Sequence, residues 1–168
     1  MTTALARHDL TDMMQAYKKT SLLRTGVELG VFDALAAAPA TAGALASTLG
    51  IHPRGARILL DALTAIRLVD RTGEHFSLTP VAREHLVRDR PDYLGGMVKV
   101  MSSDWEWDAL RDLSAAVRTG GTVLDVHAET PEYTYWEDFA AYATKVAHPT
   151  AEVMAEALAP WAKEQPEL

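Results

Sequence analysis

The segment from Val31 to Leu86 constrains the fold most, because helical and strand patterns follow one another there in a fixed order. Short helices are expected at VFDAL, between a Thr41 cap and a Gly50 stop, and from Pro53 onward. Proline suits a first helical turn, where its missing amide proton costs no hydrogen bond. The third helix carries apolar residues at helical spacing, namely Ala56, Leu59, Leu60, Leu63 and Ile66.

The only clear strand signal follows these helices. The runs LVDR and HFSL flank Thr72, Gly73 and Glu74, and the glycine can take the positive φ of a short turn. Thr79 and Pro80 then begin another short helix by the same cap-and-proline logic. Three helices and a hairpin give the order of a winged helix, with a helix-turn-helix across residues 49–52 and the hairpin as its wing.

Helical patterns also precede and follow this unit. We expect a helix opened by Thr11, with Met13, Ala16, Tyr17, Leu23 and Val27 on one stripe. Later helices are expected at YLGGMVKVM, from an Asp104 cap to Gly120, over YWEDFAAYATKV, and from Thr150 onward. The predicted fold is mainly α, a winged helix-turn-helix over residues 1–90 and a helical extension over residues 91–168. The extension is too apolar for a solvated tail, so it must pack on the winged unit or on a partner.

Several kinds of site are missing from the sequence. It contains no cysteine, which excludes disulfides and thiolate chemistry. No two of its six histidines have a metal-ligand spacing, and no G-x-G-x-x-G loop occurs. The strand-like run TVLDVHAET has His127 and Ala128 where a glycine loop would begin. We therefore expect no catalytic, cofactor-binding or metal-binding residue in this chain.

The charge balance is acidic, with 16 Lys and Arg against 23 Asp and Glu. A formal charge of −7 opposes general affinity for nucleic acid or anionic lipid. No apolar signal core or membrane-length run occurs, so a cytoplasmic protein is the expectation. A DNA-binding winged-helix regulator stays open as an alternative, because Arg54 and Arg57 lie on the second helix of the helix-turn-helix.

Four segments together resemble a known family, namely ELGVFDAL, TAGALASTLGI, RILLDAL and FSLTPVAREHL. They are similar to the N-terminal domain of class I S-adenosylmethionine-dependent O-methyltransferases that act on small molecules, including plant phenolic and bacterial natural-product enzymes. WDALRDLSAAVRTGG and YWEDFAAYATKV resemble the helices that follow the wing in the bacterial branch. The resemblance implies that the winged helix serves dimerisation rather than DNA reading, with helices of two subunits intertwined in a homodimer.

The resemblance also implies a division of labour. S-adenosylmethionine and a catalytic base would belong to a Rossmann-like domain that these residues do not include, so the chain alone would be inactive and bind no cofactor. Its own contribution would be an apolar cover over an aromatic or natural-product substrate with a reacting hydroxyl. The substrate-facing residues implied are Phe139, Tyr142, Ala143 and Val146, with Met101 and Trp105. Such a wall accelerates methyl transfer by holding the acceptor oxygen in line with the methyl carbon.

Overall fold

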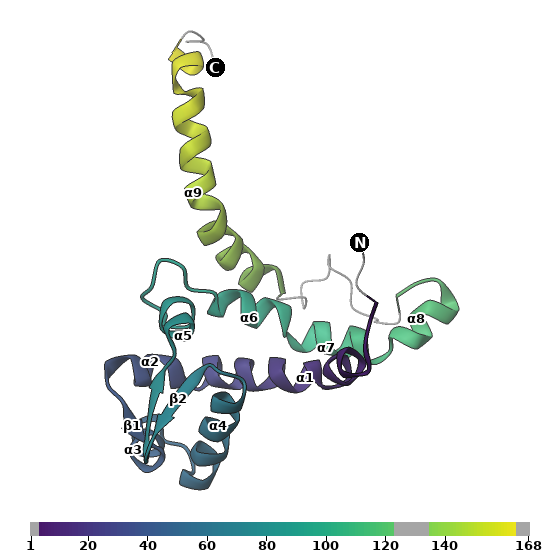
Figure 1. Ribbon diagram of the computed structural model, residues 1–168. Helices are drawn as coiled ribbons and strands as arrows, with labels where there is room; N and C mark the ends of the chain where they lie inside the picture. Colours follow the sequence, from purple (N-terminus) through teal and green to yellow (C-terminus); the bar gives the residue numbers. More distant parts are fainter. Residues whose placement is uncertain (1–3, 123–134, 164–168) are drawn as a thin grey trace. The chain divides into compact units, whose positions relative to one another are not determined.

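The computed structural model describes residues 4–122 and 135–163 and is mainly helical, as predicted (Figure 1). The chain divides into two compact units, Met1–Ser102 and Ser103–Leu168. The first unit contains α1 (Arg7–Glu28), α2 (Val31–Ala37), β1 (Ala40–Thr41), α3 (Ala42–Leu49), α4 (Pro53–Ala65), β2 (Val69–Thr72), β3 (His75–Leu78), α5 (Pro80–His85) and α6 (Gly95–Met101). The second contains α7 (Asp104–Arg111), α8 (Leu113–Thr119) and α9 (Tyr135–Lys163).

The core of the first unit lies where α2, α3 and α4 meet the small sheet. Phe32 and Phe76 are almost fully buried there, and the predicted apolar stripe of α4 faces them. Ala56, Leu59, Leu60 and Leu63 are buried, while Ile66 is half-buried at the end of the helix. The helical spacing of α4 was therefore a correct guide to its core face.

The predicted hairpin is present. Strands β2 and β3 are antiparallel with Thr72 opposite His75, so Gly73 and Glu74 form the turn, and Gly73 has a φ of 61°. The sequence showed a clear strand signal only after α4, but Ala40 pairs with Phe76 and makes β1 a third strand. A two-residue strand has too little sequence pattern to be recognised alone, and only its partner strand creates it.

The helix ends follow their local signals in α3 and α4. The Thr41 hydroxyl accepts a hydrogen bond from the Ala44 amide at 3.2 Å, and Gly50 ends α3 with a φ of 66°. Thr79 behaves differently, because its hydroxyl donates to the carbonyls of Arg67 and Leu68 instead of capping α5. It thus fastens the start of α5 to the end of the α4–β2 connection.

Three helix boundaries differ from expectation. Helix α1 begins at Arg7 rather than at Thr11, because the Asp9 carboxylate accepts the Ala6 amide at 2.7 Å and stabilises an earlier first turn. The helix expected from Asp104 to Gly120 is interrupted at Asp112, which gives α7 and α8. The two helices expected on either side of Thr150 are one helix, α9, since a proline such as Pro149 removes one backbone donor without necessarily ending a helix.

Candidate functional site

Helix α1 has two different apolar faces. In its C-terminal half, Leu22 and Leu23 pack against the core and Val27 is buried. In its N-terminal half the apolar side chains are exposed, with exposed fractions of 54–69% for Leu10, Met13, Met14 and Tyr17. We call these last four residues the α1 apolar face. The sequence placed Met13 and Tyr17 on one stripe with Leu23 and Val27, but only the latter two face the core.

A groove adjoins this face. It lies between α1 and α4 and has a volume of about 560 Å³. Its lining is Tyr17, Lys18, Ser21, Leu22 and Thr25 from α1 with Gly55, Ile58 and Leu59 from α4. Tyr17 belongs both to the groove and to the α1 apolar face, and Ile58 is 58% exposed on the opposite wall. The first unit therefore presents an exposed ridge and an apolar groove side by side.

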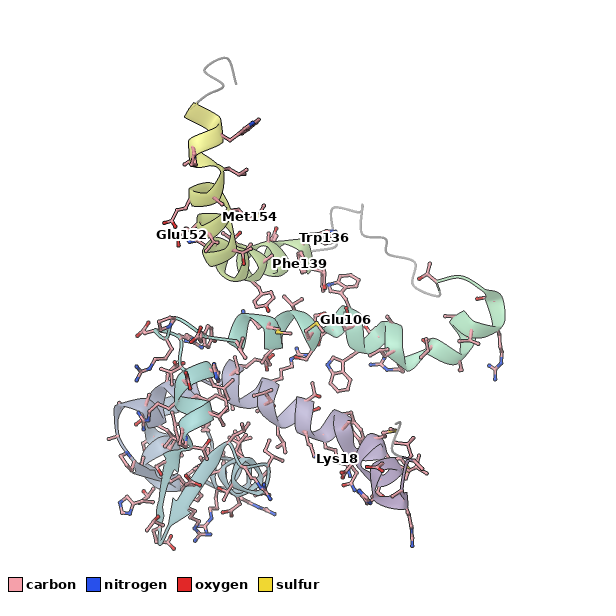
Figure 2. The ribbon with its side chains drawn as sticks, turned by 45° about the horizontal axis from the view of Figure 1, so that its top comes forward. Lys18, Glu106, Trp136, Phe139, Glu152 and Met154 are labelled. Atoms are coloured by element: carbon pink, nitrogen blue, oxygen red, sulfur yellow. The ribbon has the colours of Figure 1, made fainter. Side chains whose placement is uncertain are left out.

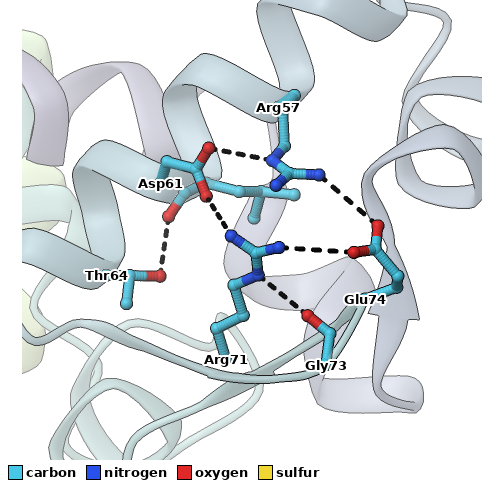
Figure 3. Close-up of polar contacts among 7 residues, drawn as sticks. Arg57, Asp61, Thr64, Arg71, Gly73 and Glu74 are labelled. Atoms are coloured by element: carbon cyan, nitrogen blue, oxygen red, sulfur yellow. Dashed lines mark hydrogen bonds and ion pairs between the residues drawn. The ribbon is translucent and has the colours of Figure 1, made fainter.

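The outer surface of α4 and the hairpin carries a network of paired charges (Figure 3). Asp61 accepts hydrogen bonds from Arg57 at 2.8 Å and from Arg71 at 3.3 Å. Glu74 lies 3.5 Å from Arg57 and 3.4 Å from Arg71. The hydrogen bond to Asp61, together with the charges of Asp61 and Glu74, raises the pKa of Arg57 above its ordinary value.

Both guanidiniums of this network also lie over one aromatic ring. The Arg57 and Arg71 groups are 5.8 Å and 5.5 Å from the centroid of Phe76. A DNA-reading winged helix needs cations on this surface that are free to approach phosphates. Here two of the cations are already satisfied by carboxylates and a ring, which disfavours the DNA-binding interpretation.

The substrate-facing residues expected on α9 share one face. Phe139, Tyr142 and Ala143 are spaced by three and four residues, and Phe139 is 39% exposed while the other two are half-buried. The Phe139 ring packs edge-on against Trp136 with centroids 5.6 Å apart (Figure 2). Val146 lies in α9, but its side chain is outside the described residues.

The two remaining expected residues lie elsewhere. Met101 is at the end of α6 in the first unit and is 63% exposed, while Trp105 is half-buried on α7 in the second. Neither of them lines the α1–α4 groove. Neither lines the polar hollow of about 410 Å³ formed by Pro80, Arg83, Glu84, Arg90, Pro91 and Asp92. The assembly of all six residues into one wall stays a prediction.

No metal centre is evident in the part of the chain that the structure describes. Within residues 4–122 and 135–163, no group of three or more His, Asp or Glu side chains is arranged to hold a metal ion. His148 contacts Glu152 at 3.6 Å, and His127 lies outside the described residues. Over the same residues, no helix is both long and apolar enough to cross a bilayer.

Comparison with known proteins identifies relatives. Residues 11–88 match the family described as the O-methyltransferase dimerisation domain. Over 151 residues the chain is 35% identical to 3-hydroxy-5-methyl-1-naphthoate 3-O-methyltransferase of Streptomyces sahachiroi, covering 84% of this chain and 43% of that protein. The chain spans less than half the length of the curated relatives it matches first.

Two solved structures extend the likeness. A Nostoc punctiforme protein described as an O-methyltransferase has a TM-score of 0.79 and 25% identity, over 94% of this chain and 48% of that one. PigF, solved with SAH, has a TM-score of 0.63 and 26% identity, over 69% of this chain and 38% of that one. The likeness thus includes a protein that holds the demethylated product of S-adenosylmethionine.

Proposed function

This chain belongs, through residues 11–88, to the O-methyltransferase dimerisation-domain family, and from that premise we propose that it is the dimerising and substrate-capping part of a small-molecule O-methyltransferase. The observation that carries this proposal is the α1 apolar face, which is exposed and continues into the groove between α1 and α4. A contiguous exposed apolar surface of this kind marks an interaction site. The winged helix then serves assembly, and a second copy of the chain is the partner.

A two-fold homodimer would account for the adjacent positions of the α1 apolar face and the groove between α1 and α4. In an isologous interface each subunit supplies the same patch, so the patch must be complementary to itself. The α1 apolar face, with Leu10 and Met14, supplies the projecting side chains. The groove between α1 and α4, with Tyr17 and Ile58, receives those of the partner. Intertwining of α1 helices buries both at once and removes from water, on each subunit, Ile58 and the four side chains of the α1 apolar face.

Sedimentation equilibrium tests the dimer. We expect the unaltered chain to be dimeric, and we expect Met14→Lys or Ile58→Glu to raise the dimer dissociation constant by about 100-fold or more, since each buries an unpaired charge. Val81→Lys is the matched control, because Val81 is also exposed, at 53%, but lies on α5 outside this surface. A monomer at all concentrations, or equal weakening by Val81→Lys, would contradict the proposal.

For catalysis we propose an apolar wall made by Phe139, Tyr142, Ala143 and Val146, with Met101 and Trp105. In the complete enzyme the methyl carbon passes from the sulfonium of S-adenosylmethionine to a hydroxyl oxygen, the hydroxyl proton goes to a base, and the thioether is released. The wall confines an aromatic or natural-product acceptor and orients its oxygen. Its apolar composition supports positioning and no acid or base role. We further propose that the 168 residues alone bind no cofactor and are inactive.

Two titrations test the absence of cofactor binding and the apolar wall separately. Calorimetry of the chain with S-adenosylmethionine should show no binding heat, and saturable binding would overturn that part of the proposal. Titration with 2-naphthol, followed by amide NMR shifts, should perturb residues 139–143 and Met101. Shifts confined to the α1–α4 groove would refute the wall and would place the aromatic site on the dimer surface instead.

A further inference from the structure

Helix α6 is poorly specified by its own sequence. It has seven residues, Gly95–Met101, and begins with two glycines. So short a helix is not stable in isolation, and glycine disfavours it further. Its position therefore depends on packing: Val100 is buried and Val98 packs against the core cluster. What holds each end of α6 decides where the residues at that end lie.

The N-terminal end is held by close packing. The Leu94 amide donates to the His85 carbonyl at 2.8 Å. The Tyr93 side chain lies against Gly95 so closely that a Cβ at residue 95 would collide with the phenol. This end is anchored on α5, and a side chain at residue 95 would require the Tyr93 phenol to move.

The C-terminal end is held by an arginine from α1. Nη1 of Arg24 donates to the Ser102 carbonyl at 2.5 Å, and Nε of Arg24 donates to Glu28 at 2.6 Å. The last carbonyls of a helix have no partner within it, and a cation there also complements the helix dipole. Glu28, one turn along α1, holds the guanidinium in the orientation that reaches Ser102.

The carbonyl that Arg24 contacts lies at a junction. Ser102 is 1% exposed and is the last residue of the first compact unit. Its hydroxyl donates to the Val98 carbonyl, while Ser103 starts the second unit by accepting the Glu106 amide and capping α7. Met101, one of the proposed substrate-facing residues, immediately precedes the anchored carbonyl.

We propose that Arg24 is a positioning residue for the substrate wall: by anchoring the end of α6 to α1, it fixes Met101 and the point where the chain leaves the first unit. The role of Met101 in this statement rests on the proposed function, whereas the anchoring rests on the contacts of Arg24 alone. Arg24 lies on α1, whose N-terminal half carries the proposed dimer surface. The same helix therefore carries both that surface and the residue that fixes Met101.

A spin label at residue 101 tests the anchoring. The sequence contains no cysteine, so Met101→Cys provides a single attachment site for a nitroxide. Because residue 101 is 63% exposed, we expect the weakly ordered spectrum of a helix surface with Arg24, a larger and faster mobile component with Arg24→Met, and partial recovery with Arg24→Lys, which keeps one donor. Ser47→Cys on α3 is the control position, and its spectrum should be the same in all three backgrounds.

Hydrogen exchange supplies a second readout. The Ser102 amide bonds to the Val98 carbonyl at 3.1 Å. Arg24→Met should speed its exchange about tenfold, while amides of α4 are unchanged, because a charge-assisted hydrogen bond at that helix end is lost. Unchanged label mobility and unchanged Ser102 exchange in Arg24→Met would overturn the inference. Equal loosening at Ser47 would also overturn it, by showing general unfolding.

Different experiments can refute the proposed substrate wall and the anchoring of α6 by Arg24. If 2-naphthol leaves Met101 unperturbed while Arg24→Met still releases the label, the anchor stands and its role toward substrate is refuted. If 2-naphthol perturbs Met101 and Arg24→Met removes only that shift, leaving those at residues 139–143, the positioning role is supported.

Discussion

The backbone of Gly26 lies directly against the aromatic ring of Phe32: a Cβ placed on Gly26 would stand 2.8 Å from Cε2 of that ring. Gly26 is buried in α1 and Phe32 is 1% exposed in α2. The ring is surrounded by core and cannot retreat, so these two helices approach to a distance that only glycine permits.

Gly26→Ala should therefore lower the free energy of unfolding by about 1–3 kcal/mol, the usual cost of overpacking a core. Gly43→Ala is the matched control, since nothing lies within 4 Å of a Cβ there and the site is helical. That variant should be stabilised by about 0.5–1 kcal/mol. Urea unfolding of both compares them directly, and equal effects would show that the Phe32 contact is not limiting.

The charge network on α4 and the hairpin should be centred on Asp61. Asp61 accepts from both Arg57 and Arg71, whereas the Glu74 side chain is 73% exposed. Asp61→Asn should therefore cost about 0.5–1.5 kcal/mol of unfolding free energy and Glu74→Gln less than about 0.5 kcal/mol. The difference should shrink at high salt, which screens exposed charges. A larger loss in Glu74→Gln would contradict this order.

The pH dependence of this network follows from the raised pKa of Arg57. A raised folded-state pKa gives a stabilisation that is fully present below the unfolded-state pKa of arginine and is lost only as pH rises through the folded-state value. Unfolding free energy measured from neutral to mildly alkaline pH should accordingly show no loss attributable to Arg57. An Arg57-dependent loss in that interval would contradict the assignment.

Two threonines that look alike in sequence should differ in how much stability is lost when each is replaced by aspartate. The Thr41 hydroxyl accepts a hydrogen bond from Ala44, a role that a carboxylate also performs at a helix start. The Thr79 hydroxyl donates to two carbonyls, which a carboxylate would repel. Thr41→Asp should change stability by less than about 0.5 kcal/mol, whereas Thr79→Asp should cost about 1–3 kcal/mol. Thermal unfolding of the pair decides, and Thr→Ser at both sites is the neutral control.

Arg67 has a positive φ of 62°, unlike the other non-glycine residues that the structure describes. That conformation strains a side chain with a Cβ and suits glycine. Arg67→Gly should therefore raise the free energy of unfolding, by up to about 1 kcal/mol. Arg54→Gly, a helical site on α4, should instead lower it by about 1 kcal/mol. Destabilisation in both variants would indicate that the Arg67 side chain has a structural role.

Part of the candidate site could be predicted from the sequence. The prediction that the segment with Phe139, Tyr142 and Ala143 is helical was correct, because the spacing of its apolar residues is a local signal. A homodimer was predicted only through family resemblance, and the sequence did not single out the α1 apolar face. The helical spacing of apolar residues placed Met13 and Tyr17 on one stripe with Leu23 and Val27. Spacing shows which residues are apolar, but not which of them are covered by a neighbouring element.

Local signals determined the elements whose ends are encoded in a few adjacent residues. Gly50 ends α3, Pro53 begins α4 and Gly73 makes the hairpin turn, because each depends only on its own backbone conformation. The tertiary structure alone decided the third strand, the exposure of Met13 and Tyr17, and the anchoring of α6 by Arg24. Those features depend on atoms far apart in sequence, and their free energy exists only once the core has brought those atoms together.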